Sequence, residues 1–446
     1  MKQSTNMEIN HFKKHIIIRI LYVFVTIVFI LVPLMSSCSH YAGMATKSSN
    51  GLKKSSANNS VPSKGISSVD TTPSNCSSSH LSSSKTNSSS APNSNNPTYS
   101  SSLSVNVTSS STSITTPSLP PLIGTNMTGG EMVYYQANTS NPVSGQDYLF
   151  VSHQDIDYIL SKGMNFIRLV FSWEGMQNNL NGSLSTNGYA NDMYDRVNYA
   201  TSKGLYVLIE PHGAVDADFG AYKGNKVGSP AVSNDDFADF WGKMATLYKS
   251  NSRVLIGLSN EPHDTPATQW FGAAQAAITA IRKAGFSNAI FVPGIGYTGA
   301  ENWTSANSTE FMKLIDPQKN LVVSVHMYTD QNSGGFDTTI VSPTVFVDRV
   351  TRVTNWAKQN NIRIHISEFA VSASNSLAQT TIDNLTNYIY NNSENLIGGS
   401  FWAYGPPSWW SGYQFTLDPT NNYSTDSPQM RLLSAFIAIN KKMNDT

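Results

Sequence analysis

The stretch Val254-Leu-Ile-Gly-Leu-Ser-Asn-Glu-Pro262 is a short, apolar and β-branched run that stops at a carboxylate. A second stretch, Arg363-Ile-His-Ile-Ser-Glu-Phe369, stops in the same way at Glu368. A sheet interior rarely tolerates an unpaired charge, whereas the mouth of a parallel barrel carries functional side chains at the carboxyl ends of its strands. The two runs therefore predict barrel strands whose ends bring Glu261 and Glu368 to one cleft.

The chain from Pro121 onward repeats this arrangement, because short strand-like runs alternate with longer amphipathic stretches. We predict eight strands, at 122–126, 165–169, 206–211, 254–258, 289–292, 321–325, 363–367 and 398–402. Eight such units over about 325 residues fit an α/β fold, a (β/α)8 TIM barrel spanning 121–446. The strand ends carry polar and aromatic side chains that a purely structural barrel does not need: Asn126, Arg168, His212, Asn260, Glu261, His326, Tyr328, Glu368 and Trp402.

Residues 1–38 have the order of an export signal. Basic residues precede the apolar run 20–35, and small residues and Cys38 follow it. The order predicts a secreted protein with a cleaved signal peptide. Met35-Ser-Ser-Cys38 resembles a bacterial lipoprotein processing box, so a lipid anchor at Cys38 is one alternative. An uncleaved signal anchor in the membrane is another.

Residues 39–120 are dominated by Ser, Asn, Thr, Pro and Lys. Such a composition cannot bury enough apolar surface to offset the entropy of ordering, so we predict a disordered linker that tethers the barrel. Several Asn-x-Ser/Thr sites fall here, and they predict glycosylation only in a host that performs it: Asn58, Asn75, Asn87 and Asn106.

Composition argues against several partners. Lys and Arg total 29 and Asp and Glu total 29, so the net charge of zero gives no basic footprint for nucleic acid. The only cysteines, Cys38 and Cys76, precede the predicted barrel, so no disulfide framework is expected there. No His/Cys cluster has metal-ligand spacing, and we expect neither a catalytic metal nor a cofactor. A monomer is the default expectation.

Two carboxylates facing one cleft suit glycoside hydrolysis, which needs a proton donor together with a nucleophile or base. An isolated Asn-Glu-Pro more often marks a loop or a helix start. A second glutamate after another strand, with Arg168 and His212 also at strand ends, favours the catalytic interpretation.

These residues carry a family resemblance. The chain resembles glycoside hydrolase family 5, a clan A cellulase family, and 260–303 is most similar to its endo-β-1,4-glucanases. The resemblance covers most of 123–418 and rests on ordered motifs: Ile167-Arg-Leu169, Glu210-Pro-His212, Ser259-Asn-Glu-Pro-His-Asp264, Val325-His-Met-Tyr328, Ser367-Glu-Phe369 and Ser400-Phe-Trp402. Two departures are Ser367 and Ala370, which stand where many members have glycines, and the absence of the disulfides common in secreted fungal members.

The resemblance implies that Glu261 is the general acid/base and Glu368 the nucleophile. Ion pairing with Arg168 and a hydrogen bond from Tyr328 would favour the ionised form of Glu368. Partial burial and the neighbouring negative charge would favour the protonated form of Glu261. A carboxyl separation of about 5 Å would mean retention of anomeric configuration.

The substrate sugar has its own predicted contacts. Asn260 is expected to bond the 2-hydroxyl, while His212 and His326 hold the same sugar or orient the glutamates, unless they are satisfied core histidines. Trp402 would form an apolar floor for the ring. Further aromatic subsites are predicted at Trp303, Trp409 and Trp410, for which rim packing is the structural alternative.

Other motifs have structural interpretations. Gly294-Ile-Gly-Tyr-Thr-Gly299 matches a dinucleotide fingerprint literally, but it follows the fifth strand, so we interpret it as a barrel loop. Strict alternation places His365 on the face opposite Glu368, toward the helices, in a structural role. Trp270 and Trp356 fall on helical stretches and are expected in the core.

Together these features predict an exported, tethered glycosidase acting on internal β-1,4 bonds of cellulose or a related β-glucan. Mannan and xyloglucan are alternative substrates, because specificity resides in loops that sequence does not orient. A surface carbohydrate-binding barrel without catalysis is the alternative from another class of protein.

Overall fold

The computed structural model describes residues 119–135, 141–212, 221–406 and 412–444. The predicted signal segment and almost all of the predicted linker, with Cys38 and Cys76, lie outside these residues. Within the described part of the chain, no helix is long and apolar enough to cross a membrane.

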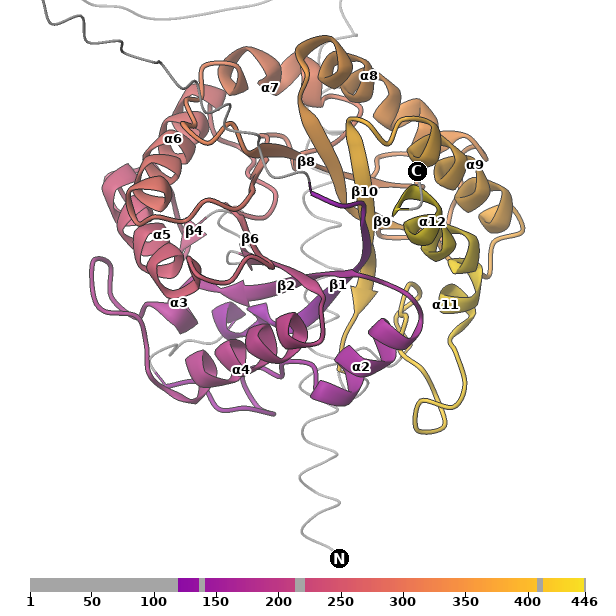
Figure 1. The fold of residues 1–446 in the computed structure, drawn as a ribbon, viewed down its shortest axis with the longest axis horizontal. Helices are drawn as coiled ribbons and strands as arrows, with labels where there is room; N and C mark the ends of the chain where they lie inside the picture. The colour runs from indigo at the N-terminus through magenta and orange to yellow at the C-terminus, as the bar shows by residue number, and fades with distance from the viewer. Residues whose placement is uncertain (1–118, 136–140, 213–220, 407–411, 445–446) are drawn as a thin grey trace, which may run out of the picture. The chain divides into compact units, whose positions relative to one another are not determined.

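Eight parallel strands close into a barrel in the order β1-β10-β9-β8-β7-β6-β3-β2 (Figure 1). Their bounds are β1 Leu122–Gly130, β2 Phe166–Ser172, β3 Tyr206–His212, β6 Val254–Gly257, β7 Ile290–Pro293, β8 Leu321–Tyr328, β9 Arg363–Ala370 and β10 Leu396–Tyr404. A separate antiparallel pair, β4 (Ala221–Tyr222) and β5 (Asn225–Lys226), interrupts the numbering after β3. Each of the eight predicted strands is present, and the predicted (β/α)8 barrel is confirmed.

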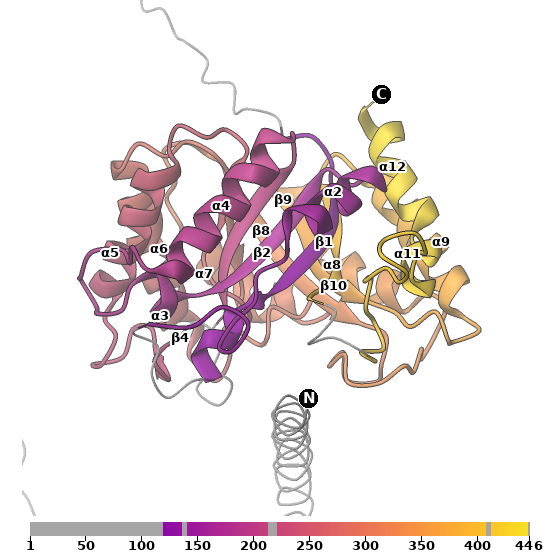
Figure 2. The ribbon, with the colours of Figure 1, turned by 90° about the horizontal axis from the view of Figure 1, so that it is seen from below.

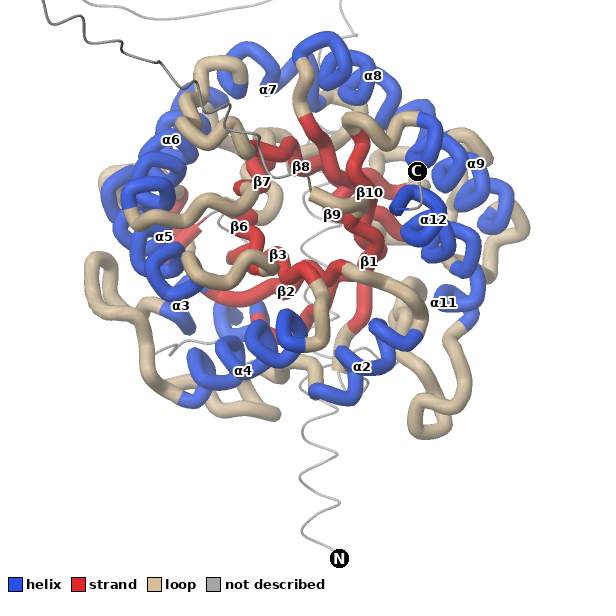
Figure 3. The backbone as a smooth tube through the Cα atoms, viewed as in Figure 1, coloured by secondary structure: helices blue, strands red, loops and turns tan. Residues whose placement is uncertain are grey.

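Helices form an outer ring around the strands, as Figure 3 shows by colour and Figure 2 shows from the side. The ring is built from α2 His153–Ser161, α4 Gly188–Ser202, α5 Asn234–Tyr248, α6 Ala267–Lys283, α7 Trp303–Phe311, α8 Val345–Asn360, α9 Ala378–Asn391 and α12 Ser434–Asn444, with the short η1 Glu131–Tyr135, α3 Trp173–Met176 and α11 Pro428–Leu432 in connections. Capping boxes fix two helix starts: Ser152 with Asp155 at α2, and Ser233 with Asp236 at α5.

The apolar core has two layers. The larger lies between the strands and the helix ring and includes Trp270, as predicted. A smaller cluster fills the barrel at the amino ends of the strands: Leu122, Phe166, Leu208, Leu255, Ala289, Phe291, Val322 and Ile397. The barrel interior is therefore packed at its base, and polar groups gather at its carboxyl end.

His365 supplies the β9 position of this inner cluster, so the prediction that it faces the helices is wrong. Its ring lies 4.9 Å from that of Phe166 and 5.5 Å from that of Phe291. The cause is an irregularity in the pairing of β8 with β9: Val325 pairs with Ile366, but His326 pairs with Glu368. This shift skips Ser367, so His365 and Glu368 both belong to the barrel interior. The expected structural role holds, because His365 Nε2 donates to Leu122 O at 3.1 Å.

Candidate active site

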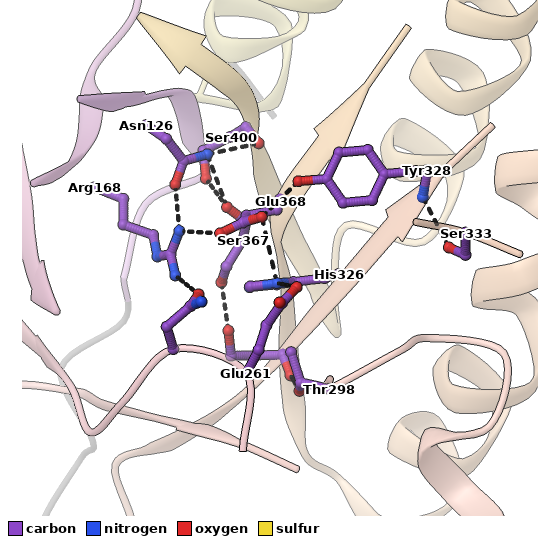
Figure 4. Close-up of polar contacts among 12 residues, drawn as sticks. Asn126, Arg168, Glu261, Thr298, His326, Tyr328, Ser333, Ser367, Glu368 and Ser400 are labelled. Carbon is purple, nitrogen blue, oxygen red and sulfur yellow. Dashed lines mark hydrogen bonds and ion pairs between the residues drawn. The ribbon is translucent and has the colours of Figure 1, made fainter. Parts of the chain in front are cut away.

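Glu368, at the carboxyl end of β9, is held by donors on both carboxylate oxygens. Arg168 Nη1 lies 2.5 Å from Oε1, and the Tyr328 hydroxyl donates to Oε2 at 2.6 Å (Figure 4). Tyr328 comes from the adjacent strand β8, and Arg168 comes from β2, three strands away on the other side of β9. Two donors, one of them cationic, stabilise the ionised carboxylate, which is the form that a nucleophile needs.

Arg168 is fully buried and donates five hydrogen bonds to four residues. Nε and Nη2 both bond Glu210 Oε1, the first at 2.8 Å. Nη1 also donates to Asn126 Oδ1 at 2.6 Å, and Nη2 to Asn260 Oδ1 at 2.6 Å. A guanidinium has five N–H donors, so every donor of Arg168 is used.

The contact with Arg168 fixes the orientation of the Asn260 amide. A cation bonds the carbonyl oxygen of an amide, so Oδ1 faces Arg168 and the Nδ2 amino group faces away. Among the described residues, that amino group has no hydrogen-bond acceptor. It is placed to donate to a bound ligand.

Glu261 follows β6 and contacts His326 of β8. His326 Nδ1 lies 2.7 Å from Glu261 Oε1 and 3.5 Å from Glu368 Oε2, so the ring bridges the two carboxylates (Figure 4). Burial raises the pKa of Glu261 to about 7, against the charges of Arg168 and His263. Burial also lowers the pKa of His326 to about 3, so the ring is neutral near pH 7. Burial, rather than a neighbouring negative charge, is therefore the main cause of the raised pKa of Glu261.

The loop after β7 holds His326 in place. The His326 amide donates to Thr298 O at 3.0 Å, and the Ala300 amide donates to His326 O at 2.9 Å. This loop contains the Gly294–Gly299 motif, which here connects β7 to α7. The barrel-loop interpretation of the motif fits this placement.

The two glutamates are close. One carboxylate oxygen of Glu261, one of Glu368 and one ring nitrogen of His326 all lie within 4.8 Å of one another. Retaining glycosidases have carboxyl groups about 5 to 5.5 Å apart, and inverting enzymes roughly 6.5 to 9.5 Å apart. The separation therefore falls on the retaining side.

The same three groups are the one set among the described residues with metal-ligand spacing. Their lone pairs already accept hydrogen bonds from Arg168 and Tyr328 or are engaged between His326 and Glu261. A cation would also have to sit beside the Arg168 charge. The donor set is thus better suited to proton transfer and nucleophilic attack than to holding a metal.

Of the remaining predicted residues, His212 and Trp402 face each other across the site. Their rings are parallel within 5°, with centroids 5.7 Å apart. Burial and the charge of Arg168 hold the pKa of His212 well below its usual range. The side chain of Trp402, half-buried at the end of β10, hydrogen-bonds the Tyr413 hydroxyl.

The structure describes only one of the three further tryptophans predicted as substrate subsites, and it places that residue in the core. Trp303 is fully buried, with its ring 5.1 Å from Trp356 and 5.6 Å from Phe311, so its assignment to a substrate subsite is wrong. It begins α7, whose inner face packs against α8. Trp409 and Trp410 lie outside the described residues.

Sequence reasoning missed two members of the Arg168 network. Asn126 stood among the strand ends but received no role; its Nδ2 donates to the carbonyls of Ser367 and Phe401, at 3.0 and 3.1 Å, and so ties β1 to β9 and β10. Glu210 was quoted only as part of a motif. The feature that could have identified Glu210 is a charged side chain inside the otherwise apolar, buried run Tyr206–His212.

A closed parallel barrel with a short carboxylate pair at the carboxyl ends of its strands is the architecture of a barrel glycoside hydrolase. A family model described as Cellulase (glycosyl hydrolase family 5) matches residues 125–408. The chain belongs to glycosyl hydrolase family 5 and is a glycoside hydrolase.

Individual relatives agree with the family. Endo-beta-1,4-glucanase A of Emericella nidulans is 34% identical over 301 residues, which are 67% of this chain and 87% of the relative. Endo-beta-1,4-glucanase B of Aspergillus niger is 35% identical over 298 residues, 66% of this chain and 84% of the relative.

Solved structures give the same result. An endo-beta-1,4-glucanase of Xanthomonas axonopodis pv. citri matches with a TM-score of 0.66 and 32% identity, covering 72% of this chain and 98% of its own. The structure of XacCel5A in complex with cellopentaose also has a TM-score of 0.66 and 32% identity, over 71% of this chain and 99% of its own.

Proposed function

We propose that this protein hydrolyses internal β-1,4-glucosidic bonds of cellulose-like glucans with retention of anomeric configuration. The observation that carries the proposal is the pair Glu261 and Glu368, whose carboxylate oxygens lie within 4.8 Å. The names of the relatives, endo-β-1,4-glucanases from fungi and bacteria, support glucan as the substrate.

In the first step, ionised Glu368 attacks the anomeric carbon while Glu261 protonates the departing glycosidic oxygen. The carbon–oxygen bond to the leaving sugar breaks as a bond from Glu368 to the sugar forms. Arg168 and Tyr328 hold the attacking carboxylate in place. The amino group of Asn260 donates to the 2-hydroxyl of the same sugar, an interaction that strengthens in the transition state.

In the second step, Glu261 removes a proton from water, and the water oxygen displaces Glu368 from the anomeric carbon. Two inversions at that carbon give net retention. His326 stays in hydrogen-bond contact with Glu261 whether that carboxyl group is protonated or ionised, because its Nδ1 lies 2.7 Å from Oε1. Trp402 provides an apolar surface beneath the reacting ring.

The proposal is tested by reducing-sugar release from carboxymethylcellulose by the wild-type protein and by Glu261→Gln and Glu368→Gln. We expect activity in the wild type and a loss of at least about a hundredfold in each variant. Proton NMR of the first products should show the β-anomer. Full activity of either variant, or α-anomer as the first product, would refute the assignment.

Substrate preference is tested with the same preparation on barley β-glucan, carboxymethylcellulose, mannan, xylan and xyloglucan. The proposal requires the β-1,4-glucans to be cleaved with the highest kcat/KM. Faster cleavage of mannan or xyloglucan would reassign the substrate but leave the carboxylate mechanism intact. Binding to glucan without cleavage of any of them would favour a binding barrel.

We also propose that the protein is secreted as a monomer, with 39–120 as a tether for the barrel. The order of charge, apolar run and small residues in 1–38 supports secretion. N-terminal sequencing and mass measurement of the mature protein distinguish a cleaved signal peptide from a lipid anchor and from an uncleaved membrane anchor. A free terminus after the signal means simple secretion, a lipid on Cys38 means a lipoprotein, and an intact Met1 in the membrane fraction means a retained anchor.

A further inference from the structure

Glu210 is a third carboxylate in the active site, and neither step of the proposed reaction uses it. It lies on β3, and the residue is 1% exposed. Oε1 accepts two hydrogen bonds from Arg168, from Nε at 2.8 Å and from Nη2. The other oxygen, Oε2, is buried and has no hydrogen-bond partner among the described residues. A buried carboxylate oxygen without a donor is costly, so its retention needs a reason.

The neighbouring strand makes room for this side chain. A Cβ atom added to Gly257 on β6 would lie 2.1 Å from Glu210 Oε2 and 2.8 Å from its carboxyl carbon. Any larger residue at Gly257 would therefore displace the Glu210 carboxylate. The packing of β3 against β6 thus depends on a glycine opposite Glu210.

Glu210 controls the direction of the other Arg168 donors. It occupies Nε–H and one N–H of Nη2, along one edge of the planar guanidinium. The three remaining N–H groups then point at Glu368, Asn126 and Asn260. Because two hydrogen bonds hold one edge of the planar guanidinium, the group cannot turn freely. Its contacts along the other edges are therefore held in place as well.

We propose that Glu210 is a positioning residue for the hydrolysis: by clamping Arg168 it aims the guanidinium at the nucleophile Glu368 and at the carbonyl of Asn260. The inference rests on the proposed function and extends it to a residue that never touches the substrate.

The charge of Glu210 has a second consequence. Among the described residues, Arg168 is the one Lys or Arg in contact with Glu210 and Glu368, and Glu261 lies close to Glu368. His212 and His326 have lowered pKa values and add no positive charge near neutral pH, whereas the charge of His263 acts on Glu261. Burial raises the pKa of Glu210 to about 7, Arg168 opposes this, and the charges of Glu368 and Glu261 add to it. By the same repulsion, an ionised Glu210 adds to the burial that raises the pKa of Glu261.

Two variants separate charge from geometry. Glu210→Gln removes the charge but keeps a carbonyl oxygen that accepts from Arg168. Glu210→Asp keeps the charge but is one methylene shorter, so its carboxylate cannot clamp Arg168 in the same place. Glu174→Gln is the matched control, because Glu174 is also 1% exposed and has a burial-raised pKa but bonds Ser172 and the Lys223 amide instead of Arg168.

The measurement is kcat and kcat/KM against pH for the full chain on an aryl β-cellobioside, with thermal unfolding of each variant as a check on folding. We expect Glu210→Gln to move the alkaline limb of the kcat/KM profile, which Glu261 sets, to lower pH by about one unit. Glu210→Asp should lower kcat on the order of 10-fold to 100-fold, with a smaller change in KM and unmoved limbs. Glu174→Gln should leave limbs and kcat as in the wild type.

An alkaline limb that stays in place in Glu210→Gln, or an undiminished kcat in Glu210→Asp, would overturn the proposal. If Glu210→Gln does not fold, the kcat of Glu210→Asp decides alone. A wild-type protein inactive on every β-1,4-glucan would instead defeat the proposed function, so the two failures are distinguishable.

Discussion

Tyr328 and Glu368 are joined by a 2.6 Å hydrogen bond from the phenol to Oε2, and the backbone around Tyr328 is itself restrained. The Tyr328 amide donates to Ser333 Oγ at 2.9 Å, and Arg349 donates to its carbonyl. The ring packs against Gly335, which has a φ of +69° and where an added Cβ would lie 2.6 Å from the ring. The β8–α8 loop therefore fixes the phenol that orients the nucleophile.

Removing this phenol should weaken the nucleophile. In Tyr328→Phe the Glu368 carboxylate loses the hydrogen bond on Oε2, so it is held less well for attack on the anomeric carbon. The lost bond to a charged group predicts a drop in kcat/KM of about tenfold to a hundredfold. Tyr158→Phe is the control, since Tyr158 donates to Asp426 at the outside of the barrel. A kcat/KM equal to that of the wild type would show that the bond is catalytically unimportant.

Glu261 should set an alkaline limit to activity. Its pKa is raised to about 7, and a general acid must be protonated to act, so kcat/KM should fall as the pH rises above about 7. In Glu261→Gln, kcat/KM should no longer show this fall above about pH 7. The variant should also lose about 10²-fold to 10⁴-fold in activity on substrates with a poor leaving group, and much less with an activated phenol, which departs without protonation. An equal loss on both kinds of substrate would contradict the role of Glu261 as proton donor.

Trp303 and Trp402 should respond to substitution in opposite ways. Trp303→Ala removes a fully buried ring and should lower the free energy of unfolding by about 3 to 5 kcal/mol, with KM unchanged in the protein that remains folded. Trp402→Ala removes a half-buried ring at the site and should impair kcat/KM with a smaller effect on stability. Urea unfolding and steady-state kinetics on both variants check this. A raised KM in Trp303→Ala would reinstate it as a substrate residue.

Much of the barrel could be predicted from sequence because its signals are local. Apolar runs that become strands, such as Val254–Gly257, are bounded by polar or turn residues, and several are followed by an amphipathic helix. The strand ends then bring Arg168, Glu261 and Glu368 together without further information, since parallel strands in a barrel share one carboxyl end.

What the sequence could not give depended on pairing between strands. The skipped residue at Ser367 turns both His365 and Glu368 inward, and strict alternation cannot foresee it. The space at Gly257 for Glu210 likewise exists only once β3 and β6 lie side by side. Trp303 was wrongly assigned to a substrate subsite. From sequence alone, an aromatic residue after a strand is equally compatible with a place in the cleft and with the first buried position of a helix.

Glu131 gives a pH-dependent stability that does not involve catalysis. It lies in η1, is 4% exposed and accepts from the Gly129 amide at 2.6 Å, and burial raises its pKa from 4.5 to about 7. Below about pH 4.5 the carboxyl is protonated in both the folded and the unfolded chain. As the pH rises from there to about 7, the unfolded chain ionises first, so this group progressively destabilises the fold, and the loss is complete above about pH 7.

Glu131→Gln keeps an acceptor for Gly129 and cannot ionise. Relative to the wild type it should therefore gain stability between pH 4.5 and pH 8, on the order of 3 kcal/mol. The buried histidines, whose lowered pKa values act with the opposite sign, are common to both proteins and cancel in the comparison. Urea unfolding at the two pH values measures the difference, and Glu301→Gln, at an exposed carboxylate, is the control. An equal effect of Glu131→Gln at both pH values would mean that the buried carboxyl does not ionise within the folded protein's working range.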